Sequence, residues 1–453
     1  MPRRNHWTSA GKEMAENPMM TRRELIRIGG LGLFLAPLEN VLRHRGIQQE
    51  SVKPPKGFPY QGTNDQLLDE MQRTSFDFFW NEASARTGQV KDRSLVNGND
   101  TRTMSSIAAT GFGLSSLCIG DYRGYGKKAE IAERVRSTLR FLASDLRNEH
   151  GFFYHFIHIE TGQRWEKCEI SSIDTSLLLC GVLTARQHFA DQEIKDLATK
   201  IYERVDWPWM LNGGAAFSMG WKPETGFLKG RWNHYCELMM ICLLGIGSPT
   251  HPVSRESWNA WTRPVIEYQG IEYISGNDPL FTHQYSQAWF DFRRKRDAYA
   301  NYFENSIKAT KAHKLFCLSL HDRFPDYSDD LWGITSSDSA KGYTAWGGPP
   351  PQGPIDGSIV PCATGGSLAF LYDDCMRVLR NIRGRYGENA WGRYGFVDAF
   401  NPLTGGHDED VLGIDLGITM LTAENHRTSF VWDTFMKNPE ARSAMQKAGF
   451  QPE

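Results

Sequence analysis

The sequence lacks the short motifs that mark metal sites. It contains no H-E-x-x-H and no C-x-x-C, so a zinc site is not predicted. The two histidines in "HFIH" at 155–158 are not enough on their own to indicate a metal site. The eight cysteines are scattered, mostly among apolar residues, which predicts buried free thiols. We therefore expect neither a metal nor a cofactor.

A long run of basic residues is absent as well. The formal net charge is -2, and the first forty residues carry six basic and four acidic side chains, so the remainder is mildly acidic. This charge argues against nucleic acid as a partner. After residue 40, no apolar stretch is long enough to span a bilayer.

The N-terminal region has the features of an export signal. Arg22 and Arg23 precede a short, weakly apolar stretch from 28 to 38, a pattern typical of the twin-arginine route out of a bacterial cytoplasm. The alternative is a basic tail with a short helix. No clear small-x-small cleavage site follows, so an uncleaved membrane anchor is a second alternative. We predict a signal at 1–40, a linker at 41–62 and a periplasmic or secreted body, which we expect to be a monomer.

The body, residues 63–450, is predicted as one all-α domain. Some predicted helices are apolar nearly all round and others are amphipathic, and an all-apolar helix must be buried. Alternation of inner and outer helices is what a closed double ring requires, and no short-period repeat indicates a solenoid. We therefore expect an α/α toroid with small β-hairpins in its loops. Helices are predicted within 64–83, 105–120, 128–144, 171–189, 191–207, 235–246, 302–320, 364–387 and 410–427, with a hairpin at 150–165.

Acidic residues stand at the entrance to one apolar run, in "RWEKCEISSIDTSLLLC". Ser171 to Asp174 fit a capping box, so Asp174 is interpreted mainly as a helix-start residue that favours the helix dipole. Glu169 and Glu166 lie before the cap, where capping does not need them. With Trp165 they suit the mouth of a sugar cleft, although an isolated loop acid is more often only solvated.

A second candidate acid is Glu237, in "NHYCELMMICLLGIGSPTHP". It is the only charged residue between two histidines, and its helical neighbours are apolar. A carboxyl in such surroundings should have a raised pKa, which a general acid needs near neutral pH. The alternative is a first-turn glutamate that faces solvent.

Several loops alternate polar and aromatic residues, as a surface that binds sugar hydroxyls and stacks on sugar rings would. The clearest is "THQYSQAWFDFR", and similar loops contain "KDRS", "GFFYHF" and "SMGWKPETG". The same aromatic residues could equally belong to the core. The candidate substrate contacts are Arg93, Tyr154, His155, Trp165, Asp174, Trp221, His283, Gln284, Tyr285, Trp289 and Asp291.

Several of these stretches, in order along the chain, resemble the glucoamylase-like domain family that contains bacterial endo-β-1,2-glucanases. They include "FDFFWNEASARTGQVKDRS", "CEISSIDTSLLL", "YCELMMICLLGIGSPTHP", "WGITSSD" and "GRYGFVDAFNP", and the resemblance runs from about residue 65 to 450. It implies an (α/α)6 toroid and metal-independent, inverting hydrolysis of linear β-1,2-glucan to short oligosaccharides. It also implies that Glu166, Glu169 and Glu237 are the essential carboxylates. An aspartate is expected where Glu166 stands.

Three other activities compete with hydrolysis. Related domains in larger proteins transfer glycosyl groups instead. A polysaccharide lyase could use a similar toroid, with His234 and Tyr235 as base and acid, although the acidic residues argue against a uronate substrate. The third alternative is a non-catalytic glycan-binding protein.

Overall fold

The computed structural model describes residues 57–277 and 279–453. The predicted signal, with Arg22 and Arg23, and most of the predicted linker lie outside the described residues. Residues 57–62 pack against a C-terminal helix: Arg380 donates to the carbonyl oxygens of Tyr60 and Gly62 at 3.2 and 2.6 Å.

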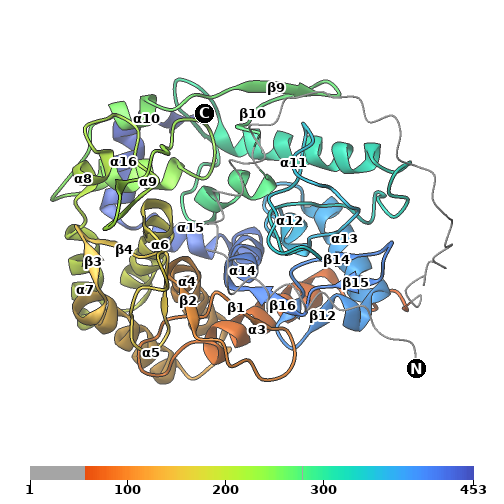
Figure 1. Cartoon of the computed structure of the whole chain (residues 1–453), viewed down its shortest axis with the longest axis horizontal. Helices are drawn as coiled ribbons and strands as arrows, with labels where there is room; N and C mark the ends of the chain where they lie inside the picture. Colours follow the sequence, from red (N-terminus) through yellow and green to blue (C-terminus); the bar gives the residue numbers. More distant parts are fainter. Residues whose placement is uncertain (1–56, 278) are drawn as a thin grey trace.

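The described chain is mostly helical (Figure 1). Its α-helices are α3 (Asn64–Asn81), α4 (Ile107–Arg123), α5 (Lys128–Arg140), α6 (Ser172–His188), α7 (Gln192–Glu203), α8 (Trp207–Leu211), α9 (Met239–Gly247), α10 (Glu256–Asn259), α11 (Tyr302–Ser319), α12 (Pro361–Gly365), α13 (Tyr372–Arg385), α14 (Gly413–Thr428), α15 (Phe430–Phe435) and α16 (Pro439–Ala448). A π-helical turn, η2 (Phe141–Asp145), extends α5, and short 3-10 turns are η3 (Leu280–His283), η4 (Tyr285–Ala288) and η5 (Gly387–Asn389).

The strands are short and form only small antiparallel sheets within the described residues. The pairs are β1 (Arg93–Leu95) with β16 (Asp410–Leu412), β2 (Met104–Ser106) with β5 (Phe156–His158), β3 (Asn148–Glu149) with β4 (Phe152–Phe153), β9 (Val265–Tyr268) with β10 (Ile271–Ile274), β11 (Lys295–Arg296) with β17 (Gln451–Pro452), β12 (Trp391–Gly392) with β13 (Gly395–Phe396), and β14 (Phe400–Asn401) with β15 (Gly406–His407). A three-stranded sheet joins β6 (Ile170–Ser171), β7 (Gly220–Lys222) and β8 (Gly226–Phe227).

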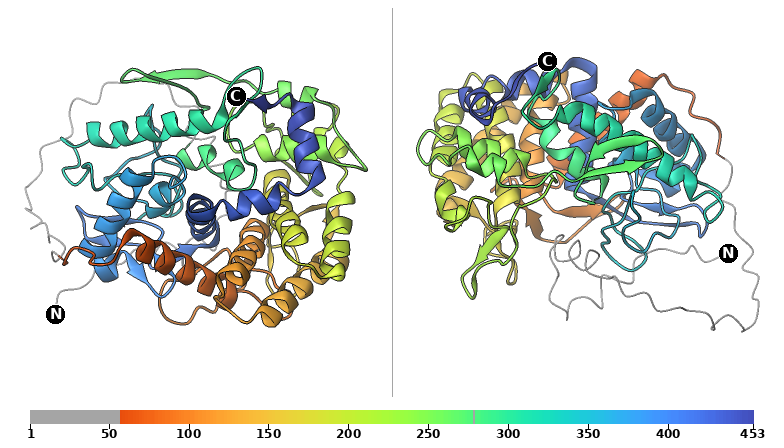
Figure 2. Two further views of the ribbon diagram at one scale, coloured as in Figure 1. Left: turned by 180° about the vertical axis from the view of Figure 1, so that it is seen from behind. Right: turned by 90° about the horizontal axis from the view of Figure 1, so that it is seen from above.

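Inner and outer helices differ in burial, as the sequence predicts. Nearly all of α4 and α6 is buried, and so is every residue of α9 and α12, whereas α5, α7 and α13 bury one face. The inner helices α4, α6, α12 and α14 lie nearer the middle of the molecule, and α5, α7 and α13 lie toward its edge (Figure 1). The dark blue C-terminal segment runs from α14 at the centre to α16 at the periphery, where it packs on α9 (Figure 2).

The inner elements contact one another in a closed circuit. Helix α4 packs on α6 and α14, α6 packs on α9, and α12 packs on α14 and α13. The η3–η4 segment completes the circuit, because the Met240 amide donates to Ser286 Oγ at 3.1 Å and Gln284 donates to the Ala363 carbonyl at 3.0 Å.

Helices α4 and α6 approach closely at two glycines. A Cβ placed on Gly181 would lie 2.0 Å from the carbonyl oxygen of Gly111, and one on Gly111 would lie 2.4 Å from that of Leu177. Both positions therefore require glycine.

Short strands join the N-terminal ends of three inner helices. Strands β16, β2 and β6 lead directly into α14, α4 and α6, and β16 pairs with β1. Bridges from Lys91 to Ser105 and from Tyr154 to Ile170 extend the pairing, and β6 continues to β7. Residues in these segments therefore lie at one end of the molecule, where the candidate site is found.

One helix boundary and one helix cap differ from the sequence prediction. The expected helix at 364–387 is two helices, α12 and α13, because the chain turns through 366–371. The sequence predicts helix α3 from Asn64, and the helix begins there, but Asn64 is not its cap: Thr63 caps the helix, in a reciprocal capping box with Gln66. The eight cysteines are free, and all but Cys168 are buried, as predicted. No helix in the described part of the chain has the length and apolar character needed to cross a membrane.

Candidate active site

Glu169 is a buried carboxylate held by a histidine. It precedes β6, its residue is 5% exposed, and its Oε1 lies 3.1 Å from His155 Nδ1. Burial by itself acts to raise the pKa of Glu169, but the hydrogen bond and charge of His155 outweigh burial, so the pKa falls to about 2. Its other oxygen, Oε2, is buried without a hydrogen-bond partner. Glu169 is therefore an ionised group with one oxygen available to a ligand or water.

Asp174 both begins the helix and touches this pair. Ser171 is the N-cap of α6, as predicted, and accepts from the Asp174 amide at 3.3 Å. The Asp174 carboxylate accepts a hydrogen bond from the Ser171 hydroxyl, and its Oδ1 lies 3.6 Å from His155 Nε2. The imidazole of His155 thus lies between the carboxylates of Glu169 and Asp174.

Glu237 is buried just before an inner helix. Helix α9 begins at Met239, so the prediction that Glu237 lies on the helix is wrong by two residues. Its residue is 6% exposed, and its carbonyl oxygen accepts from Ser286 Oγ at 2.7 Å. The segment that carries it is bound to the start of α6, because the indole N–H of Trp232 donates to Ser172 Oγ at 3.0 Å. Glu237 and Glu169 therefore come from neighbouring segments.

The turn between β5 and Glu169 carries the other residues predicted beside it. Glu166 is exposed, in a left-handed conformation with φ of 47°. The indole nitrogen of Trp165 is buried without a hydrogen-bond partner. Arg164 stabilises the turn, because its Nε donates to the Cys168 carbonyl at 2.7 Å. Its guanidinium lies 4.9 Å from the centre of the Tyr154 ring. Trp221, half-buried, pairs with Ile170 across β7 and β6.

The structure buries four of the predicted sugar contacts. Gln284 and Trp289 are 0% exposed, Tyr285 1% and His283 3%. The Trp289 indole N–H donates to Ser115 Oγ at 2.9 Å, and Gln284 donates to α12.

Burial lowers the pKa of His283 to about 3, with His313 adding to the effect, and its Nδ1 lies 3.0 Å from the Tyr235 hydroxyl. These four side chains present almost no surface to a sugar and pack as part of the core. Asp291 is partly exposed and pairs with Arg293 at 2.9 Å.

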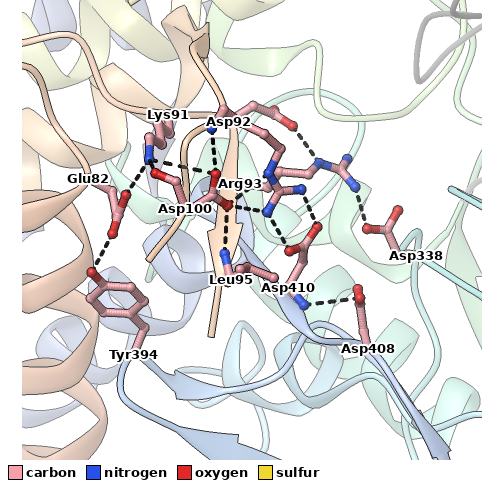
Figure 3. Close-up of polar contacts among 11 residues, drawn as sticks. Glu82, Lys91, Asp92, Arg93, Leu95, Asp100, Asp338, Tyr394, Asp408 and Asp410 are labelled. Atoms are coloured by element: carbon pink, nitrogen blue, oxygen red, sulfur yellow. Dashed lines mark hydrogen bonds and ion pairs between the residues drawn. The ribbon is translucent and has the colours of Figure 1, made fainter. Parts of the chain in front are cut away.

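The sequence prediction missed a group of aspartates beside Arg93 (Figure 3). Arg93 donates to Asp338 and, at 3.1 Å, to Asp92. The carboxylates of Asp338, Asp408 and Asp410 offer oxygens that all lie within 4.8 Å of one another. We call these three residues the aspartate triad. The Asp410 carboxylate also accepts two hydrogen bonds from the Arg102 guanidinium, each at 2.6 Å.

Two further aspartates extend this group inward. Asp398 Oδ2 accepts from the Asp338 amide at 2.6 Å. Burial raises the pKa of Asp398, and the neighbouring carboxyls, Asp415 first, raise it further. Asp415 occupies the third position of α14, as Asp174 does in α6. The available signal was three aspartates within "HDEDVLGID", directly before an apolar helix.

Comparison with known proteins agrees with the resemblance predicted from the sequence. Residues 229–439 match the family model Glycoamylase, described as "Putative glucoamylase". The chain is 28% identical over 430 residues to a curated protein of Parabacteroides distasonis named exo β-1,2-glucooligosaccharide sophorohydrolase (non-reducing end). That match covers 86% of this chain and 58% of the relative, so the chain spans well under two thirds of its length.

Two solved structures that are similar to this chain are also of β-1,2-glucanases. An endo-β-1,2-glucanase from Chitinophaga pinensis, in complex with sophorotriose and glucose, is 26% identical with a TM-score of 0.78, over 86% of this chain and 99% of that chain. A β-1,2-glucanase from Parabacteroides distasonis is 27% identical with a TM-score of 0.78, over 86% of this chain and 60% of that chain.

Proposed function

We propose that this protein is a glycoside hydrolase that cleaves β-1,2-glucan to short oligosaccharides. The observation that carries the proposal is the pair of buried carboxylates, Glu169 and Glu237, on neighbouring segments at the N-terminal end of the inner helices. The relatives named above act on β-1,2-linked glucose, one by exo and one by endo cleavage.

The two carboxylates have different roles in the proposed reaction. Hydrolysis requires a proton donor for the leaving oxygen and a base or nucleophile opposite it. Glu169 is ionised across the physiological range, because its pKa is about 2, so it suits activation of water. Glu237 is the proposed proton donor. Exposed Glu166 and the half-buried Trp165 are placed to contact the substrate from the turn before Glu169.

The proposed mechanism inverts the configuration at the anomeric carbon. An inverting pair leaves room for a water molecule between the acid and the sugar, whereas a closer pair would form a covalent intermediate and could transfer glycosyl groups. A lyase reaction through Tyr235 is disfavoured, because Tyr235 is 0% exposed and its hydroxyl hydrogen-bonds to buried His283.

We further propose that the fold is an (α/α)6 toroid. The circuit of contacts supports six inner members, namely α4, α6, α9, the η3–η4 segment, α12 and α14. The outer members are α3, α5, α7, α16, α11 and α13. The C-terminal α16 takes the outer place against α9, between α7 and α11.

A panel of linear glucans of defined linkage tests the proposed function. Wild-type protein should release short oligosaccharides from β-1,2-glucan and from no α-1,4- or β-1,3-glucan, as read by product chromatography. Glu237→Gln should lose the activity and still bind β-1,2-linked oligosaccharides, whereas the exposed Glu272→Gln should behave as wild type. Binding without cleavage by the wild type would indicate a glycan-binding protein, and an unsaturated, UV-absorbing product would indicate a lyase.

We also propose export by the twin-arginine route, on the strength of Arg22 and Arg23 before the apolar stretch. The double substitution Arg22→Lys, Arg23→Lys should leave the protein in the cytoplasm of a bacterial host, as measured by cell fractionation. Normal export of the double variant would contradict this proposal.

A further inference from the structure

The aspartate triad joins two distant parts of the chain at the end of the molecule where the candidate active site lies. Asp408 and Asp410 flank the start of β16, which leads into α14, and Asp338 belongs to the long loop after α11. Asp338 and Asp408 are 8% and 7% exposed. The triad is therefore almost enclosed, and its charge has to be balanced locally.

The charged groups around the triad do not balance it. Arg93 and Arg102 are the guanidinium groups bound to it, and each is shared with a further aspartate, Asp92 and Asp100 respectively. Lys91 lies 2.7 Å from Glu82 and 3.8 Å from Asp100, and Lys91 and Glu82 together add no net charge. Counted as carboxylates, these five aspartates against two guanidinium groups give a formal charge of -3 (Figure 3).

One oxygen of the triad has no protein partner. Asp408 Oδ1 accepts from the Asp410 amide at 3.1 Å, but Oδ2 is buried and unbonded. A buried carboxylate oxygen without a donor is costly. Because the three ligand oxygens lie within 4.8 Å of one another, an ion at bonding distance from Asp408 can reach the other two carboxylates.

We propose that Asp338, Asp408 and Asp410 bind one divalent cation of the Ca²⁺ type. An all-oxygen set of carboxylates is what hard cations select, and Ca²⁺ with bonds of about 2.3–2.6 Å can span oxygens up to roughly 5 Å apart. The cation balances most of the excess charge and ties the loop that contains Asp338 to the start of α14. It takes no part in the proposed cleavage, and the inference does not depend on the proposed function.

Calcium binding to metal-free protein tests the inference. Full-length protein is passed over a chelating resin, then titrated with CaCl₂, or with MgCl₂ alone, by calorimetry, and its Tm is measured with and without each salt. We expect one Ca²⁺ per chain and a Tm higher by roughly 2–4 °C at saturation. A smaller binding heat and a smaller Tm increase with Mg²⁺ than with Ca²⁺ would agree with the same hard-cation site.

Asp408→Asn supplies the matched variant, and Asp322→Asn, at an exposed position, is the control. Asp408→Asn should weaken Ca²⁺ binding about 10-fold or more, because ligand charge sets the affinity of such sites. In metal-free buffer its Tm should equal or exceed that of the wild type, because a repelling charge is gone.

Absence of binding heat and of any Tm change in wild-type protein at 10 mM CaCl₂, a concentration roughly ten times the weakest natural calcium sites' Kd, overturns the proposal. The triad is then neutralised by shared protons. Ca²⁺ binding that survives unchanged in Asp408→Asn also overturns it, since the ion is then bound elsewhere. The wild-type titration decides the question even if Asp408→Asn does not fold.

Discussion

At the residue scale, the site depends on one imidazole between two carboxylates. His155 lies 3.1 Å from Glu169 and 3.6 Å from Asp174, and all three residues are at least partly enclosed. A carboxylate buried to this extent would ordinarily hold its proton more tightly. The histidine reverses that tendency for Glu169, so the ionisation of the proposed base depends on a neighbour that need not touch the substrate.

His155→Gln should raise the pKa of Glu169 from about 2, because the charge of His155 and its hydrogen bond are the strongest effects that oppose burial. A base must be ionised to act, and its activity is lost as the pH falls through its pKa. The acid limb of kcat/KM should therefore move to higher pH by about 2 units or more. The measurement is the pH profile of kcat/KM, with the exposed His251→Gln as control. An unshifted acid limb in a folded His155→Gln variant would mean that His155 does not set this ionisation.

Asp174→Asn tests whether the helix-start role is the main one. The substitution removes a charge at the N-terminus of α6 and leaves the Ser171 hydroxyl only a neutral amide oxygen as acceptor, so stability should fall by about 0.3–1 kcal/mol. Urea denaturation measures the loss. A kcat/KM lowered more than roughly 100-fold with unchanged stability would show instead that Asp174 acts in the site, through His155 or on the substrate.

At the scale of the elements, periodicity predicted most helices but could not assign buried polar groups. All-apolar runs such as 172–183 can only be inner helices, and the structure places them there. The alternating polar and aromatic residues at 283–289 could be either buried or exposed, so this pattern alone does not place them. Its side chains find partners inside the protein, such as Ser115 and Ala363, that are distant in sequence and invisible to any local pattern.

Separation along the sequence also explains why the sequence analysis missed the aspartate triad. Asp338 and Asp408 are seventy residues apart, and only the pairing of β16 with β1 and the path of the long loop bring them together. Glu169 and Glu237 could be selected as candidates from the sequence because each lies beside an apolar run. A cluster assembled from two distant segments gives no comparable local signal.

Gly181→Ala tests the close approach of α4 and α6. Its Cβ would lie 2.0 Å from the Gly111 carbonyl oxygen, so the helices must separate, at a cost of about 1–3 kcal/mol beyond any gain in helix propensity. Thermal unfolding should show a lower Tm. Gly126→Ala is the control, since its Cβ would meet no backbone atom, only the side chains of Ile131 at 3.2 Å and Phe76 at 3.5 Å. A Gly181→Ala variant as stable as wild type would contradict the packing described for these helices.

At the scale of the whole molecule, the fold gathers its candidate functional groups at one end. The N-terminal ends of α4, α6 and α14 are linked by short strands, and α9 joins them through Trp232 and Ser172. The carboxylates Glu169 and Glu237 and the aspartate triad all lie on the segments that precede these helices or on the loop that contacts them. The inner helices thus hold a set of loops at one end, an arrangement in which binding and catalysis are usually found.

The most direct test of the account is the anomeric form of the first product released from β-1,2-glucan, followed by proton NMR in early turnover. Inverting hydrolysis by Glu169 and Glu237 predicts new α-anomeric reducing ends that later equilibrate, and a rate lower by about 10²–10⁴ in Glu237→Gln. New reducing ends that appear first as the β-anomer, or a Glu237→Gln variant that cleaves at the wild-type rate, would contradict it.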